Sequence, residues 1–112
     1  MKGELQNKVN QLSLMEQNIQ NFSLQKQQFQ VQLMELESAE KELKDSKEAF
    51  KIIGNIMVAG DKDKIRKELA DKKEILKTRI ESFEKQEGKL KEKAESLQKE
   101  VLEEMRQSEK SD

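Results

Sequence analysis

The sequence AFKIIGNIMVAGD, residues 49–61, decides the fold, because it is the stretch that does not continue a charged helical pattern. Residues 49–53 and 56–60 are rich in β-branched and other apolar residues, which favour strands. Gly54-Asn55 lies between them, and a glycine at this point supplies the positive φ angle of a two-residue hairpin turn of type II′. The stretch therefore predicts a β-hairpin over about residues 49–60.

This turn fixes which residues of the two predicted strands lie opposite each other. The pairs are Ile53 with Ile56, Ile52 with Met57, Lys51 with Val58 and Phe50 with Ala59. Since side chains alternate between the two faces of a strand, one face of the hairpin is apolar and the other differs only by Lys51. A two-stranded hairpin is marginally stable in water, so we expect further protein to cover this one.

The sequence on either side of the hairpin predicts two long helices, over about residues 4–48 and 62–107. The chain has no proline, and the first segment consists mainly of Gln, Glu, Lys, Leu and Asn, which do not break a helix. Either Asp61 or Asp63 can cap the second helix. Residues 108–112 are expected to form a frayed tail.

Apolar residues recur every seven positions in both predicted helices, which is typical of a coiled-coil seam. The a and d positions start at Leu5 and Lys8 in the first helix, and at Arg66 and Leu69 in the second. Neither helix can bury its stripe alone, so we expect them to pack as an antiparallel pair. The fold class is therefore mainly α, a long antiparallel two-helix coiled coil joined by one central β-hairpin.

Two adjacent layers of this seam are mismatched. The register that places Leu33 opposite Leu76 also places Lys26 opposite Phe83 and Phe22 opposite Glu87. We expect the Lys26 stem to lie over the aromatic ring and to carry its charge outward.

The composition argues against a nucleic-acid-binding protein and against an enzyme. The 112 residues contain 22 basic and 23 acidic side chains, and a formal net charge of -1 offers no attraction to a phosphate backbone. His and Cys are absent, which removes the commonest general base and the usual zinc ligands. We expect no catalytic residues, cofactor or metal. No apolar run reaches the roughly 20 residues of a membrane span, so we expect a cytoplasmic protein without membrane association.

Apolar residues also gather where the two predicted helices end, opposite the hairpin. The set consists of Leu5, Val9, Leu12, Val101, Leu102 and Met105. Val9 and Leu102 fall outside the seam and should stay exposed. Two interpretations remain open: an adaptable adhesive tip in which Met repacks against different partners, or single exposed apolar residues of the ordinary kind.

The chain consists of a helix, a single hairpin and a second helix, with the hairpin in FKIIGNIMVAGDKDKI (residues 50–65) and the second helix in LADKKEILKTRIESFEKQEGKLKEKAESLQKEV (residues 69–101). This order of elements resembles the β-type subunits of the prefoldin family, archaeal ones above all. The likeness covers about residues 4–105 and implies that residues 1–112 form a single prefoldin-like domain. It implies a hexamer of two α-type and four β-type subunits whose hairpins form a β-barrel. It also implies an ATP-independent holdase that captures non-native proteins at the coiled-coil tips and transfers them to a cytosolic group II chaperonin.

The resemblance further implies two sets of functional residues. The oligomerisation set is Phe50, Ile52, Ile53, Ile56, Met57 and Val58. The client-binding set is Leu5, Val9, Leu12, Val101, Leu102 and Met105. Phe50 stands where the family often has Tyr, so any hydrogen bond that this hydroxyl makes within the barrel is missing here. The rival hypothesis is a structural coiled-coil spacer or tether that oligomerises through the hairpin.

Overall fold

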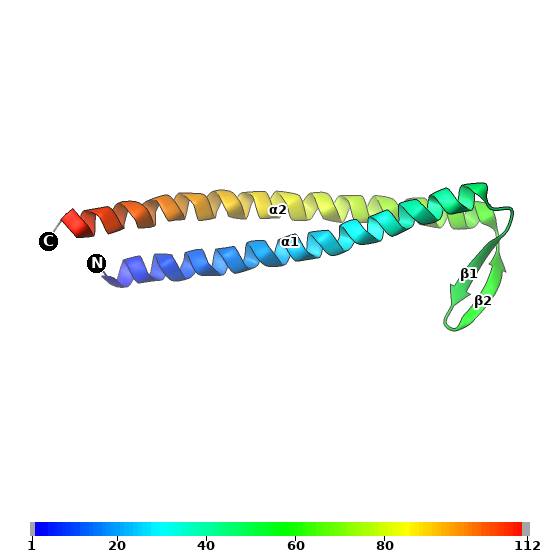
Figure 1. The fold of residues 1–112 in the computed structure, drawn as a ribbon, viewed down its shortest axis with the longest axis horizontal. Coiled ribbons are helices and arrows are strands. Elements are labelled where there is room, and N and C mark those ends of the chain that lie inside the picture. The colour runs from blue at the N-terminus through cyan, green and yellow to red at the C-terminus, as the bar shows by residue number, and fades with distance from the viewer. Residues whose placement is uncertain (1, 111–112) are drawn as a thin grey trace. The chain divides into compact units, whose positions relative to one another are not determined.

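The computed structural model describes residues 2–110 and is mainly helical. Its elements are α1 (Lys2–Asp45), β1 (Ala49–Ile53), β2 (Ile56–Gly60) and α2 (Lys62–Lys110) (Figure 1). Two long helices joined by a two-stranded antiparallel hairpin confirm the predicted fold class. The contacts divide the chain into a terminal unit, Met1–Lys26 with Ser82–Asp112, and a hairpin unit, Gln27–Glu81. The expectation of a single domain stays a prediction.

The first helix ends at Asp45, earlier than the predicted boundary near residue 48. The N–H of Ser46 turns back to the Leu43 carbonyl at 3.2 Å, and the Ser46 hydroxyl donates to the Glu48 carbonyl at 2.6 Å. Serine competes in this way for backbone groups and so favours a helix end over a helix interior. The ammonium of Lys62 donates to the Ser46 carbonyl at 2.6 Å and to the Lys44 carbonyl at 3.4 Å, and the Lys44 carbonyl is one of the acceptors that the helix end leaves free.

Asp61 caps α2, which decides between the two predicted capping residues. Its Oδ1 accepts from the Asp63 N–H at 3.0 Å, and its carbonyl accepts from the Ile65 N–H at 3.0 Å. Asp63 instead forms an exposed ion pair with Arg66 at 3.2 Å. At its other end α2 continues to Lys110, so residues 108–110, expected in a frayed tail, are helical. Nothing from Glu103 to Lys110 breaks a helix; residues 111–112 lie outside the described part.

The hairpin has the predicted register. Its pairs are Phe50 with Ala59, Lys51 with Val58, Ile52 with Met57 and Ile53 with Ile56, and Ala49 pairs with Gly60 at the base. Gly54 has a φ of 61°, whereas no non-glycine residue between positions 2 and 110 has a positive φ. A left-handed first residue followed by an ordinary second one agrees with the type II′ turn.

The heptad pattern describes the burial of both helices. Every predicted a and d position of α1 from Leu5 to Leu43 is partly buried, and in α2 only Arg66 among these positions is exposed. In the hairpin unit Leu76 and Ile80 are buried, and the Arg79 guanidinium lies 5.7 Å from the centre of the Phe29 ring. In the terminal unit Ala94 and Val101 are buried. The seam is therefore confirmed within each unit.

The two mismatched layers pair differently from the prediction. Phe22 contacts Phe83, with ring centres 5.8 Å apart, and Lys26 lies 3.4 Å from the Glu87 carboxylate, so its charge does not point outward. Side chains on a helix lean toward its N-terminus. In an antiparallel pair this lean carries Lys26 and Glu87 toward each other across the layer boundary. The two aromatic rings contact each other and the opposite charges pair, so neither layer keeps the predicted mismatch.

Candidate functional site

The hairpin exposes every side chain of the predicted oligomerisation set. The exposed fraction runs from 39% for Val58 to 68% for Ile52, and the set is Phe50, Ile52, Ile53, Ile56, Met57 and Val58. The sheet has two strands, so each strand keeps one backbone edge unpaired in the described residues. The structure thus gathers these residues on one ribbon with two apolar faces and two free edges. Their role in oligomerisation stays a prediction.

The base of the hairpin is fixed to the start of α2. Ala49 is buried, and a Cβ at Gly60 would lie 2.6 Å from Cδ1 of Ile65, so the strand packs closely on the helix at this point. The Lys51 ammonium forms an ion pair with Glu68 at 3.1 Å. Beyond this base, the hairpin projects from the paired helices of its unit (Figure 1). The apolar ribbon is therefore held out in a defined direction instead of folding back on its helices.

The predicted client-binding set divides into two groups in the terminal unit. Val9 is 38% exposed, Leu102 53% and Met105 48%, which confirms that Val9 and Leu102 lie outside the seam. Leu5 and Leu12 are partly buried and Val101 is buried, because these three lie at seam positions. Only the first group offers side chains to a partner without unpacking the helices. Client binding by either group stays a prediction.

Lys8 ties the beginning of α1 to the end of α2. Its ammonium donates a hydrogen bond to the Glu104 carboxylate and lies 3.6 Å from Glu100. The hydrogen bond to Glu104 is the main reason that the pKa of Lys8 is raised above its usual 10.5. Sequence reasoning missed this pair, although opposite charges at seam positions one turn apart are the signal for it.

Glu87 is a buried carboxylate in the same unit, with 6% of its surface exposed. It accepts a hydrogen bond from Lys91 at 2.7 Å, and Lys26 approaches from the other helix. The hydrogen bond from Lys91 and the charge of Lys26 hold the pKa of Glu87 below its usual 4.5, against the opposite effect of burial. A third interhelical pair joins Lys73 to Glu40 at 3.7 Å in the hairpin unit.

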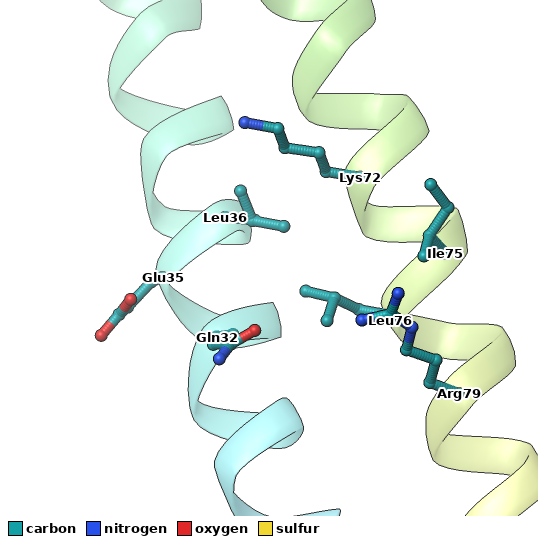
Figure 2. Close-up of a pocket in the computed structure, with 7 residues that line it drawn as sticks. All are labelled: Gln32, Glu35, Leu36, Lys72, Ile75, Leu76 and Arg79. Carbon is teal, nitrogen blue, oxygen red and sulfur yellow. The ribbon is translucent and has the colours of Figure 1, made fainter. Parts of the chain in front are cut away.

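A groove opens beside the seam of the hairpin unit (Figure 2). Its lining residues are Gln32, Glu35, Leu36, Lys72, Ile75, Leu76 and Arg79. Figure 2 shows Leu36 and Leu76 between the two helices, Lys72 extending toward α1, and Glu35 pointing away from the groove. The seam leucines thus form its apolar part, and long charged side chains flank them.

Two further features bear on the class of site. Among residues 2–110, no group of His, Cys, Asp and Glu side chains is placed to hold a metal ion. The helices of the described part include none with the length and apolar character to cross a membrane.

Two helices packed along a heptad seam and joined by an exposed apolar hairpin define a class of coiled-coil subunit. The family model for the prefoldin subunit matches residues 6–108. The prefoldin subunit beta of Archaeoglobus fulgidus is 38% identical over 100 residues, which cover 86% of this chain and 86% of the relative. The prefoldin subunit beta of Pyrobaculum aerophilum is 34% identical over 105 residues, which cover 90% of this chain and 82% of the relative.

A solved structure agrees with these relatives. The crystal structure of the prefoldin beta subunit from Thermococcus strain KS-1 matches with a TM-score of 0.87 at 32% sequence identity, covering 92% of this chain and 93% of that one. The chain belongs to the prefoldin subunit family, a family of chaperone subunits. The resemblance stated from the sequence is confirmed.

Proposed function

We propose that this chain is the β-type subunit of a cytoplasmic prefoldin hexamer with two α-type and four β-type subunits. The hexamer acts as an ATP-independent holdase, captures non-native proteins at the coiled-coil tips and passes them to a group II chaperonin. The observation that carries the proposal is the distribution of exposed apolar side chains. Six of them cover both faces of the hairpin, Val9, Leu102 and Met105 lie beside the chain ends, and Leu14, Leu24, Val31, Met34 and Ile75 are scattered along the helices between.

The hairpin supports the assembly part of the proposal. Full burial of a side chain such as Ile52 or Ile56 contributes roughly 1.5–3 kcal/mol, and both are more than half exposed. Free strand edges add backbone hydrogen bonds when another strand pairs with them. Hairpins from several subunits that close into a barrel would remove the edges and bury one apolar face of each ribbon.

The exposed residues at the chain ends support the capture part. A non-native protein exposes apolar segments of many shapes, and a surface that binds them must adapt. Met105 has a flexible, polarizable side chain that repacks readily, and Val9 and Leu102 add apolar area beside the seam. Because these three lie outside the seam, they can contact a client while the helices stay packed.

The capture part is tested by protection of a denatured protein from aggregation. Guanidinium-unfolded citrate synthase is diluted into buffer without nucleotide, with the assembled complex present, and light scattering is followed. The triple variant Val9→Ser, Leu102→Ser, Met105→Ser is expected to need about tenfold more complex for half protection, since three apolar contacts are lost. The matched control is Ile75→Ser, an exposed apolar residue of the hairpin unit.

The outcomes separate the proposal from the rival spacer. Protection by the wild type and the control, with weak protection by the triple variant, supports capture at the tips. Equal protection by all three complexes contradicts it. An assembly that gives no protection at any ratio favours the spacer. Transfer is tested by adding a group II chaperonin to the client complex: the client should move to the chaperonin, and a client that stays in place contradicts this step.

A further inference from the structure

The outer face of α1 in the terminal unit is nearly free of charge. Between residues 3 and 26 the charged side chains are Glu4, Lys8, Glu16 and Lys26. Lys8 and Lys26 lie in the seam, where they pair with carboxylates of α2. Neither of the two glutamates occupies an outward position opposite the seam. What remains on that side consists of amides, serine, glycine and leucine.

One stripe of this face has the spacing of a continuous helical surface. The neutral stripe is Gln6, Asn10, Leu14, Gln17, Asn21 and Leu24, in steps of three and four residues, and every member is exposed. Leu14 is 59% exposed and Leu24 58%. The Gln6 side chain donates to Asn10 at 3.1 Å, so two of the amides lie in contact along the stripe.

The outer face of α2 in the same unit has the opposite character. Its exposed positions at comparable spacing are Lys85, Lys89, Glu92, Glu95, Lys99, Glu103 and Arg106. A charged side chain loses strong hydration when a partner covers it, whereas a carboxamide offers both a donor and an acceptor to the partner. The two helices of the unit therefore differ in which one can be covered at low cost in free energy.

We propose that the neutral stripe is a second client-binding surface, which takes uncharged, extended segments of a non-native polypeptide. This inference rests on the proposed holdase function and extends the contact from the tip along α1. An unfolded chain presents unpaired backbone N–H and C=O groups, which the amides of Gln6, Asn10, Gln17 and Asn21 can satisfy. Its apolar side chains then contact Leu14 and Leu24. A surface that contacts only water would have no reason to lack charged side chains.

The test uses the absence of cysteine from the chain. Single variants Leu14→Cys and Leu24→Cys are labelled with bimane, a fluorophore whose emission shifts to the blue in an apolar environment. The matched controls are Glu95→Cys and Lys85→Cys, which lie at the same levels of the seam on the outer face of α2. Each labelled complex is titrated with reduced, carboxymethylated α-lactalbumin, which stays unfolded in buffer.

We expect a blue shift at positions 14 and 24 on addition of the unfolded protein, and none at 95 or 85. In unlabelled complexes, Leu14→Glu with Leu24→Glu should raise the dissociation constant for this client about tenfold. The charge reversal Glu95→Lys with Lys85→Glu should leave it unchanged. Circular dichroism and the mass of the complex show whether each variant is folded and assembled.

Four results would overturn the inference. In the first, the client binds and its binding is sensitive to substitution of Val9, Leu102 and Met105, but the emission at positions 14 and 24 does not shift. The proposed function then stands, and the neutral stripe does not bind the client. A blue-shifted emission before any client is added means that a second copy of the chain covers the stripe. Equal shifts on α1 and α2 mean that the client covers the unit without selecting the neutral face. If no client binds at all, the proposed function fails and the inference fails with it.

Discussion

Replacement of Lys26 by Met removes one partner of the buried carboxylate at Glu87. Only 6% of the Glu87 surface is exposed, and its two cationic neighbours are Lys91 at 2.7 Å and Lys26 at 3.4 Å. Removal of one member of a fully buried pair costs about 3–5 kcal/mol. Lys91 remains after the substitution and the Lys26 side chain keeps 22% exposure, so we expect a smaller loss of about 1–2 kcal/mol.

The double variant Lys26→Met, Glu87→Met separates the ion pair from the packing. It turns the layer apolar beside Phe22 and Phe83, and replacement of both members of such a pair is often neutral or stabilising. We therefore expect its free energy of unfolding to return to within about 1 kcal/mol of the wild type. The control is Arg66→Met, which breaks an exposed pair with Asp63 and should change the free energy by less than about 0.5 kcal/mol.

The assay is urea unfolding followed by far-UV circular dichroism at one fixed protein concentration, because assembly adds to the apparent stability. The reasoning is refuted if Lys26→Met is no more destabilising than Arg66→Met. It is also refuted if the double variant is as unstable as the single one, since the loss would then come from packing and not from an unpaired buried carboxylate.

Three further predictions follow from particular residues. The pKa of Glu87 is lowered, mainly by the hydrogen bond from Lys91, so its contribution to stability is present above pH 4.5 and is lost as the pH falls through the lower folded-state pKa. Glu87→Gln should therefore make the free energy of unfolding, measured with urea, depend less steeply on pH in this acid range, and an unchanged dependence counts against the pair. Lys8→Met should speed amide hydrogen exchange in residues 4–12, because the tie to Glu104 is lost, and equal exchange in both proteins speaks against that tie. Gly54→Val places a β-branched residue at a φ of 61°, which costs at least about 1–2 kcal/mol, so the complex should dissociate at about tenfold higher concentration in sedimentation experiments, while Asn55→Ala should not; equal behaviour of the two variants contradicts the turn.

The hairpin was predictable because its signals are local. Alternation of side chains sets the faces, and Gly54-Asn55 sets the turn, so a register that pairs Ile53 with Ile56 follows from neighbours in sequence. The seam was predictable for a similar reason, since a repeat of seven is visible without knowledge of the partner helix.

The diagonal contacts were not predictable from flat layers. Two ion pairs show this, Lys26 with Glu87 and Lys8 with Glu104. In each pair, the carboxylate lies about one helical turn away from the residue that the register places directly opposite the lysine. They arise from the lean of side chains toward the N-terminus of each helix, a three-dimensional property that a pairing scheme of a and d positions leaves out. The choice of Asp61 over Asp63 as cap and the end of α1 at Asp45 depend likewise on single hydrogen bonds, which helix propensity does not resolve.

The candidate surfaces were predictable as residues but not as functions. The same apolar pattern puts Val101 inside the seam and Leu102 outside it, so the sequence tells which side chain stays exposed. It does not tell what contacts the exposed one, because the binding partner lies outside the chain.

The central claim is that the exposed hairpin brings several subunits together. The most direct measurement is the mass of the native complex, for this chain alone and mixed with an α-type prefoldin subunit, beside the variant Ile52→Lys with Ile56→Lys, which places one charge on each face of the ribbon. The account predicts a hexamer of four copies with two α-type subunits for the wild type, and a helical monomer for the variant. A wild-type chain that stays a stable monomer with and without the α-type subunit contradicts it.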